Sequence, residues 1–292
     1  MAADAGRLAG EGAFFMARLS PDQKKFALFS FGNPTRLVIV DVARGSRQVL
    51  PGPQTPWIAW APDNRHVVHT GAVRDSAALV WILDDNSRPA EPFAGSVRVQ
   101  GFPLFWSPDG TALFTMRGSS LLAYTVADGN SRVFSDLPAE MNWPALSPDG
   151  KWIAYAALET GASRADVFVQ PWPALDRKWK ISNGGGSASA WTRGGRELVY
   201  LKPHPDSAPG MMSAFSVDIG AGPEFSHGEP RELFTAVFGQ GAPGRTWDLT
   251  ADGARFLNVV GRTPDLPPGD IHVMVNWFPQ LQRLMGEATA RQ

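Results

Sequence analysis

The stretch Trp106-Ser107-Pro108-Asp109-Gly110 ends a short apolar segment in a tight turn, and six versions of this turn signal occur along the 292-residue chain. They begin at Ser20, Ala61, Ser107, Ser147, Thr192 and Thr250. Consecutive copies start 41, 46, 40, 45 and 58 residues apart. A period of roughly 40–50 residues is typical of a β-propeller, in which each repeat forms one blade of four strands.

The residues of the signal suit a turn between two strands. Proline sets φ near the value that the first central turn position needs, aspartate accepts hydrogen bonds from the backbone just after it, and glycine or asparagine tolerates positive φ. A large apolar residue precedes every signal: Leu19, Trp60, Trp106, Leu146, Trp191 and Leu249. We expect these residues to pack each blade against the next. The aspartates are therefore interpreted as turn formers and not as paired catalytic carboxylates.

Further strand-like segments follow each signal, as at Val67–Val68, Leu79–Leu83 and Glu91–Phe93. The sequence predicts an all-β protein, a six-bladed β-propeller of four-stranded antiparallel blades that occupies residues 1–278. The sixth blade reaches only its third strand, at 271–277, so we expect the N-terminal residues 6–10 to supply the missing strand and close the ring. Leucines and a methionine at helical spacing predict a short C-terminal helical tail over 279–292.

Composition and charge exclude several classes of function. The chain has 27 basic and 28 acidic residues, a net charge of −1 and no cysteine. No basic stripe of the kind that binds nucleic acid is visible, and disulfides and thiolate metal sites are excluded. The longest apolar run, Ala77 to Leu83, is too short to span a membrane. The N-terminus has no signal-peptide pattern. We expect either a cytoplasmic protein or a fragment of a longer one.

The six turn signals resemble those of the Pro-Asp repeat propellers typified by periplasmic TolB. The fullest copy is at 106–110, weaker copies stand at Leu19, Trp60 and Leu146, and degenerate copies follow Trp191 and Leu249. The resemblance extends from about Phe14 to Trp277. It implies the propeller fold, and it implies no particular activity.

The C-terminal part resembles the end of the propellers that are fused to bacterial membrane-spanning serine/threonine kinases. The residues concerned are 252–257, 271–278 and 281–284. In that family a cytoplasmic kinase is followed by one membrane helix and then by a sensor propeller. The resemblance implies a sensor portion that is extracytoplasmic, or periplasmic. A stand-alone homologue, which would be cytoplasmic if this is the full-length chain, remains the alternative.

Motifs for catalysis and metal binding are weak. The hydrolases that carry such propellers need a G-x-S-x-G nucleophile elbow, and the stretch 185–189 lacks its last glycine. We expect the channel to be lined by residues two, four and five places before each turn signal. These positions offer one aspartate and one asparagine, too few oxygens for a calcium site. We therefore expect no catalytic residue, no metal and no cofactor.

The same positions predict a binding site at one mouth of the channel, because aromatic residues and an arginine at a concave surface favour recognition. The candidate residues are Phe15, Trp57, Phe102, Asn142, Trp143, Arg245 and Trp247. Arg18 and Asp248 occupy the same position in blades one and six. We expect an ion pair between them across the ring closure, with a ligand contact as the alternative.

We interpret the chain as a non-enzymatic propeller that binds an unknown protein, peptide or small molecule, as the sensor part of a bacterial receptor-type kinase. The alternative is a stand-alone hydrolase or lyase with its site at the channel mouth. A cluster of titratable groups within hydrogen-bond reach at that mouth would favour the enzyme. A third interpretation is an interaction module that recruits proteins on its flat faces.

Overall fold

The computed structural model describes residues 7–9, 13–31, 35–51, 57–70, 77–81, 91–92, 99–118, 120–136, 142–205, 210–222, 224–238, 245–258 and 270–274. The predicted helical tail at 279–292 lies outside these ranges.

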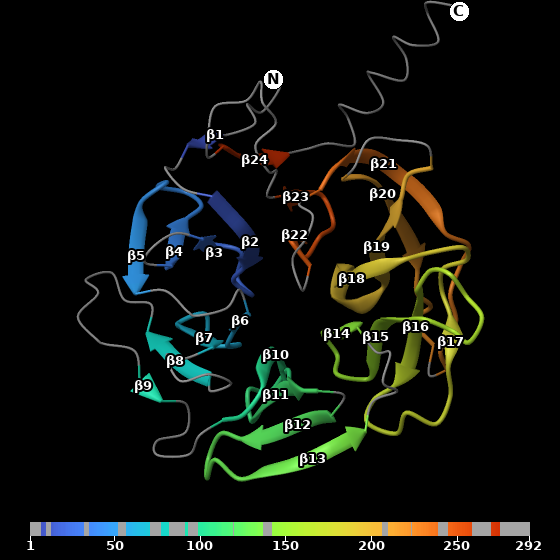
Figure 1. Ribbon diagram of the computed structural model, residues 1–292, viewed down its shortest axis with the longest axis horizontal. Coiled ribbons are helices and arrows are strands. Elements are labelled where there is room, and N and C mark those ends of the chain that lie inside the picture. The colour runs from blue at the N-terminus through green and yellow to red at the C-terminus, as the bar shows by residue number, and fades with distance from the viewer. Residues whose placement is uncertain are drawn as a thin grey trace, which may run out of the picture.

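Strands account for nearly all regular structure, and they form four-stranded antiparallel sheets around a central axis (Figure 1). Blade 1 contains β2 (Ala13–Leu19), β3 (Lys25–Phe31), β4 (Arg36–Asp41) and β5 (Arg47–Pro51). Blade 2 contains β6 (Ile58–Trp60), β7 (His66–Thr70), β8 (Ala77–Trp81) and β9 (Glu91–Pro92). Blade 3 contains β10 (Phe102–Trp106), β11 (Ala112–Arg117), β12 (Ser120–Thr125) and β13 (Ser131–Asp136).

The second half of the chain repeats this order. Blade 4 contains β14 (Asn142–Leu146), β15 (Trp152–Ala157), β16 (Asp166–Pro171) and β17 (Trp179–Lys180). Blade 5 contains β18 (Ser187–Thr192), the short 3-10 helix η1 (Arg193–Gly195), β19 (Glu197–Pro203), β20 (Met211–Asp218) and β21 (Arg231–Val237). The remaining sheet, called blade 6, contains β22 (Trp247–Leu249), β23 (Phe256–Asn258), β24 (Asp270–Met274) and β1 (Arg7–Ala9).

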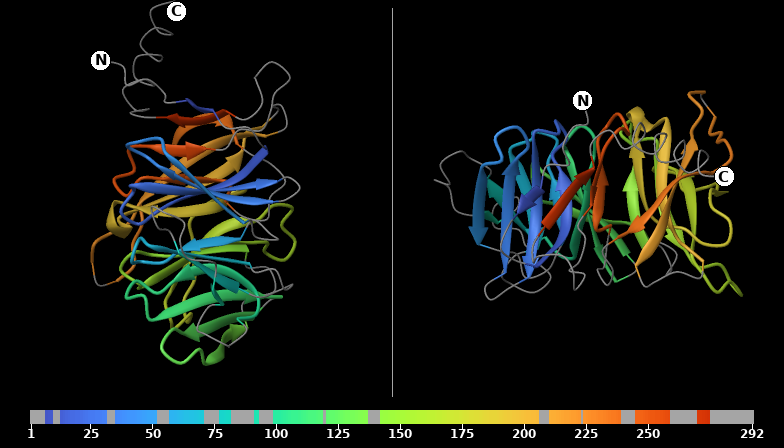
Figure 2. Two further views of the ribbon diagram at one scale, coloured as in Figure 1. Left: turned by 90° about the vertical axis from the view of Figure 1, so that its left-hand side faces the viewer. Right: turned by 90° about the horizontal axis from the view of Figure 1, so that it is seen from above.

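The predicted all-β propeller with four-stranded antiparallel blades is confirmed. In the side views the sheets stand next to one another around the axis (Figure 2). The first and last described strands pair in blade 6, where β1 lies against β24 through Arg7 and His272, Leu8 and Ile271, and Ala9 and Asp270. N-terminal backbone therefore lies along the outer edge of this sheet.

The turn signals fold as their chemistry predicts. In blade 3 the Ser107 hydroxyl donates to Asp109 at 2.6 Å, Asp109 accepts from the Thr111 amide at 3.0 Å, and the Ala112 amide donates back to Ser107 at 2.9 Å. The hydrogen bond from Ser107, together with those from Thr111, lowers the pKa of Asp109 to about 2. Gly110 has a φ of 71°, a conformation that glycine adopts at no steric cost.

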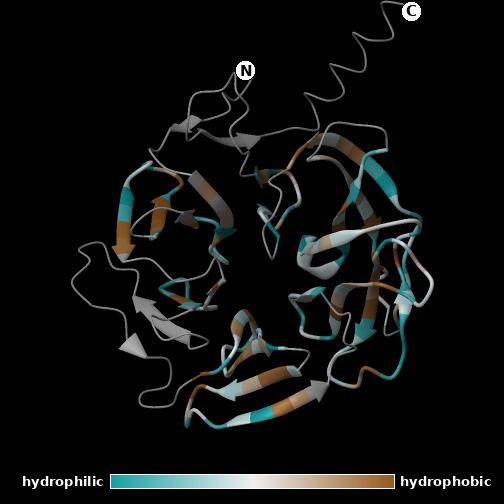
Figure 3. Ribbon diagram, in the orientation of Figure 1, coloured by the Kyte–Doolittle hydropathy of each residue, from teal (hydrophilic) through white to brown (hydrophobic). Residues whose placement is uncertain are grey.

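The core lies between neighbouring sheets. Blades 1 and 2 share a buried cluster that includes Phe29, Ile39 and Trp60, and blades 1 and 6 share another that includes Phe26 and Leu257. Comparable clusters lie between blades 2 and 3, 3 and 4, 4 and 5, and 5 and 6. The apolar residues accordingly concentrate within the strands (Figure 3). Each sheet thus buries side chains against both neighbours, which fixes the positions of the inner strands.

Among the described residues, none of the helical structure is long and apolar enough to cross a membrane.

Candidate functional site: an axial pocket

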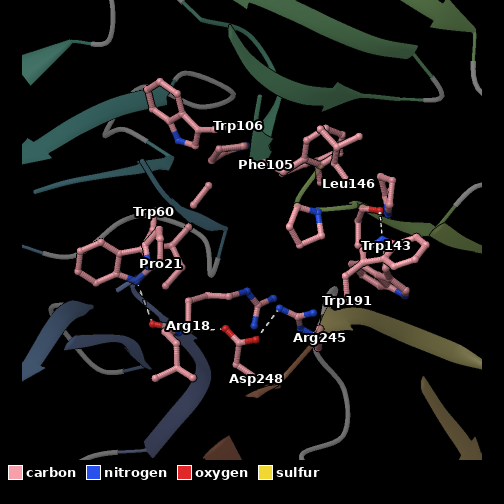
Figure 4. Close-up of a pocket in the computed structure, with 18 of the residues that line it drawn as sticks. Arg18, Pro21, Trp60, Phe105, Trp106, Trp143, Leu146, Trp191, Arg245 and Asp248 are labelled. Carbon is pink, nitrogen blue, oxygen red and sulfur yellow. Dashed lines mark hydrogen bonds and ion pairs between the residues drawn. The ribbon is translucent and has the colours of Figure 1, made fainter. Parts of the chain in front are cut away.

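The inner strands enclose a pocket of about 460 Å³ on the propeller axis (Figure 4). Its volume falls in the usual range for small-molecule sites, roughly 300–1,000 Å³. Five of the six residues that stand two places before a turn signal line this pocket: Arg18, Ala59, Phe105, Ala145 and Asp248. The inner-strand residues therefore reach the axis at the position that the repeat predicts.

One end of the pocket is aromatic. The ring of Trp57 stacks on Trp143 with centroids 5.4 Å apart and on Phe102 with centroids 5.3 Å apart. These residues come from three consecutive blades, 2, 3 and 4, and the contact between Trp57 and Trp143 joins two blades that are not neighbours. Trp57 and Trp143 line the pocket, whereas Phe102 supports Trp57 from outside the lining.

An irregular inner strand places Trp143 in this stack. The pairing of β14 with β15 shifts register between Asn142 and Ala145, and Trp143 has a φ of 57°. Such a left-handed conformation is an outlier for a bulky residue and is often retained where function needs it. A β-bulge of this kind redirects side chains. In blade 5 the equivalent residue, Ala188, has a φ of 53° at an equivalent register shift.

The opposite end of the pocket is formed by the turn signals, because β6 separates Trp57 at one end from Pro62 at the other. Prolines from four turns line it: Pro21, Pro62, Pro108 and Pro148. Neighbouring turns are closely packed, since a Cβ atom at Gly150 would lie 3.3 Å from Cγ of Pro108. The turn signals therefore form one end of the pocket, in addition to connecting the strands of each blade.

Tryptophans just before the turns link neighbouring blades at the pocket wall. The indole Nε1 of Trp60 donates to the carbonyl of Arg18 at 2.9 Å, and that of Trp191 donates to the carbonyl of Ala145 at 2.9 Å. Both indoles also line the pocket. These residues serve the predicted blade packing and, in addition, form the wall of the site.

Three charged residues line the pocket among the described residues: Arg18, Arg245 and Asp248 (Figure 4). Nη2 of Arg245 lies 2.8 Å from Oδ1 of Asp248. The other carboxylate oxygen, Oδ2, accepts from the Leu19 amide at 3.0 Å, which joins blade 6 to blade 1.

The predicted pair between Arg18 and Asp248 needs correction, because Asp248 forms its ion pair with Arg245 instead. Arg245 lies three residues before Asp248 on the same chain segment and reaches it directly. Nη1 of Arg18 donates to the carbonyl oxygens of Ala17 at 2.7 Å and Trp247 at 3.3 Å. Arg18 and Asp248 do lie on neighbouring inner strands, as the repeat predicts, and Asp248 accepts a hydrogen bond from the Leu19 amide of blade 1.

Trp247 lies outside the predicted mouth. It is 0% exposed and packs in the core between blades 5 and 6, with its ring 5.3 Å from that of Phe256. Side chains alternate along a strand, so Trp247 must face away from its neighbour Asp248. The guanidinium of Arg245 lies 5.3 Å from the Trp247 ring centroid, so Trp247 supports the site from behind.

The remaining predicted residues have different outcomes. Trp57, Trp143 and Arg245 line the pocket and Phe102 stacks on Trp57. Asn142 is exposed at the start of β14 and is not part of the lining. The side chain of Phe15 lies outside the described part of the structure.

Sequence reasoning missed several lining residues, among them Phe105, Trp106, Ser189 and the turn prolines. Phe105 occupies a position at which the repeat predicts a channel-lining residue, although it is not among the predicted binding residues. Ser189 lies within the register shift of β18, and no sequence pattern predicts this shift. Within the described ranges no three His, Asp or Glu side chains gather in a way that could hold a metal ion.

Comparison with known proteins supports the assignment of the fold. No protein-family model matches the chain. It is 27% identical over 162 residues to a protein of Bacillus subtilis (strain 168) described as the uncharacterized peptidase YuxL. That match covers 52% of this chain and 23% of the relative, so the chain spans about a quarter of the relative's length.

Two solved structures have similar folds. TolB from Acinetobacter baumannii superimposes with a TM-score of 0.56 and 17% identity, over 71% of this chain and 52% of that one. A putative TolB from Agrobacterium tumefaciens gives 0.59 and 17%, over 80% and 84%. Because identities this low carry information on fold and not on activity, the conclusion is that this chain folds as a TolB-like β-propeller.

Proposed function

We propose that this chain is a non-enzymatic binding propeller whose ligand occupies the axial pocket. The observation that supports it most is the pocket itself, in which Trp57 and Trp143 present aromatic surface next to Arg245. Recognition sites commonly combine apolar walls with a few convergent polar groups. The ligand is a small molecule or a short segment of a peptide or protein.

A variant that fills the pocket tests this proposal. Ala145 lines the cavity, so Ala145→Trp should occupy the space that a ligand needs. A library of small molecules and peptides would be screened for compounds that raise the melting temperature of the wild-type protein. We expect these shifts to vanish in Ala145→Trp, provided that its circular dichroism spectrum is unchanged. Equal shifts in both proteins would contradict the proposal.

We further propose that the propeller is the sensor part of a bacterial receptor-type serine/threonine kinase. The support is the sequence resemblance over 252–257, 271–278 and 281–284, of which part lies outside the described residues. An extracytoplasmic location follows from this proposal, whereas a stand-alone protein would be cytoplasmic. Reading the full coding frame of the gene tests it: a kinase and a membrane helix upstream are expected, and a frame that contains neither contradicts it.

A hydrolase or lyase is the second candidate. It is favoured by the contact between Arg245 and Asp248 and by the relative named as a peptidase. A general base must reach a substrate proton, however, and both oxygens of Asp248 already accept hydrogen bonds. Incubation with a peptide library followed by mass spectrometry separates the candidates. Cleavage that Asp248→Asn abolishes would favour the enzyme.

A further inference from the structure

The charges in the axial pocket do not balance. Of the described residues that line it, Arg18 and Arg245 carry positive charge and Asp248 carries negative charge. The formal sum is one uncompensated positive charge in a cavity with mostly apolar walls. Burying a charge without a partner is costly, because the low-dielectric interior replaces its hydration.

Asp248 pairs with only one of the two arginines among the described residues. Its Oδ1 accepts from Arg245 at 2.8 Å and from the Leu249 amide at 3.0 Å, and its Oδ2 accepts from the Leu19 amide. The hydrogen bonds that Arg18 donates to described residues run through one nitrogen, Nη1, and end on two neutral carbonyls. The guanidinium of Arg18 thus has no carboxylate of its own among the described residues.

Two further donors near this charge are unused. Ser189 is 3% exposed and lines the pocket, and its Oγ has no hydrogen-bond partner among the described residues. The buried Nε of Arg245 likewise has no hydrogen-bond partner among the described residues. The side chain of Arg245 lies beside the backbone of Ser189, since its Nη1 donates to the Ser189 carbonyl at 3.2 Å. Buried polar groups without partners often mark a place where something else binds.

The electrostatics of Arg18 agree with this geometry. Burial, followed by the like charge of Arg245, lowers the pKa of Arg18 to about 9, and Asp248 offsets only part of this effect. Like charges held together in a poorly solvated place are relieved by a counterion. A single negative charge from a ligand would neutralise the cluster.

We propose that the axial pocket recognises an organic monocarboxylate, with the carboxylate held by Arg18 and Arg245 and an apolar or aromatic body packed against Trp143 and Phe105. This inference rests on the proposed function of the pocket. Arginine suits the role because its planar guanidinium matches a carboxylate with paired hydrogen bonds. A monocarboxylate balances the charge, whereas a phosphate dianion would leave an excess of negative charge.

Matched pairs of probes test the carboxylate directly. Isothermal titration would compare naphthoate with naphthamide, which has the same rings and no charge. It would also compare an acetylated dipeptide ending in phenylalanine with its C-terminal amide. We expect each acid to bind at least about tenfold more tightly than its amide. Tighter binding of the peptide acid would identify a C-terminus as the source of the carboxylate, and tighter binding of naphthoate would identify a free acid.

Arg18→Met removes the unpaired cation and leaves the pair between Arg245 and Asp248 intact. We expect it to reduce naphthoate affinity to the level of naphthamide and to leave naphthamide affinity unchanged. Arg44→Met is the matched control, because Arg44 is exposed in the turn between β4 and β5. Should Arg18→Met fail to fold, Ser189→Ala serves instead, with a loss of about tenfold expected for the acid alone.

The outcomes are distinguishable. Equal affinity for acid and amide, an unchanged naphthoate affinity in folded Arg18→Met, or no binding of any acid at millimolar concentration would overturn the carboxylate proposal. If amides bind as well as acids and Ala145→Trp abolishes both, the pocket still binds ligands and only the carboxylate inference fails. If no compound depends on an open pocket, the proposed function fails with it.

Discussion

Two clusters in this propeller each combine one carboxylate with two arginines, and they differ in their contact with water. In blade 5, Glu197 is 5% exposed at its side chain and pairs with Arg193 at 3.1 Å and Arg231 at 3.0 Å, whose side chains are 54% and 47% exposed. On the axis, Asp248 and Arg245 are 12% and 18% exposed, and Arg18 is the second arginine.

The comparison teaches that the same set of charges can serve structure or binding. At Glu197 the excess positive charge lies at the surface, where water and salt screen it. At Asp248 it lies in an apolar cavity, where a ligand is the available counterion. The cluster at Glu197 is further completed by the Ser216 hydroxyl, which donates to Oε1, whereas Ser189 beside Arg245 has an unused hydroxyl. Four comparisons of variants test this difference.

The largest effect is expected from Asp248→Asn. This change leaves two poorly solvated arginines without a negative charge and should lower the free energy of unfolding by about 3–5 kcal/mol. Urea denaturation followed by tryptophan fluorescence measures it. Glu197→Gln is the matched change, and it should cost only about 1–3 kcal/mol because water solvates its arginines. Equal losses in the two variants would show that solvent contact does not distinguish the clusters.

Removal of residues 1–12 should have the next largest effect. It deletes β1, which pairs with β24 at three positions. We propose that this pairing holds the ring closed, and with it the contact between Leu19 and Asp248. At about 1 kcal/mol for each hydrogen bond the loss is about 2–4 kcal/mol. Hydrogen exchange should show faster exchange in blade 6 and at Leu19, with blade 5 and Glu197 unaffected. An unchanged melting temperature would refute the role of β1.

A pair of serine substitutions separates the clusters more finely. Ser216→Ala removes a hydrogen bond to the buried carboxylate of Glu197, and it should cost about 1.5–3 kcal/mol. Ser189→Ala removes a hydroxyl that bonds to no described residue, so its melting temperature should match that of the wild type. Thermal unfolding of both variants is the measurement. A clear loss in Ser189→Ala would mean that its hydroxyl already has a structural role.

The smallest expected effect is a difference in the sign of the change in unfolding free energy between two arginine variants. Arg231→Met breaks a half-exposed ion pair and should cost up to about 1 kcal/mol. Arg18→Met replaces a buried cation that repels Arg245 with an apolar side chain, so it should leave the unfolding free energy unchanged or raise it by about 1 kcal/mol. Residues kept for binding are often unfavourable for stability. A large loss in Arg18→Met would assign Arg18 to the fold instead of the ligand.

The fold was largely predictable because the turn signal carries its own chemistry. Pro108, Asp109 and Gly110 specify a turn locally, and the repeat then places every inner strand on the axis. The sequence also placed Trp57, Phe102 and Trp143 together, and the structure stacks them. Alternation along β22 puts Trp247 on the opposite face from Asp248, which is the core side.

The charged cluster was less predictable, because the partner of a charged side chain depends on local geometry. The repeat made Arg18 and Asp248 neighbours, but Asp248 pairs with Arg245, which lies three residues before it. The register shifts at Trp143 and Ala188 likewise change which side chains face the axis. Such irregularities depend on tertiary packing, which a single sequence does not display.

The most direct test of the carboxylate site is a crystal structure of the protein grown with naphthoate. The account predicts electron density for the carboxylate within hydrogen-bond distance of Arg18 and Arg245, with the rings against Trp143 or Phe105. Naphthoate bound only elsewhere, or bound in the pocket with its carboxylate turned away from both arginines, would contradict the account.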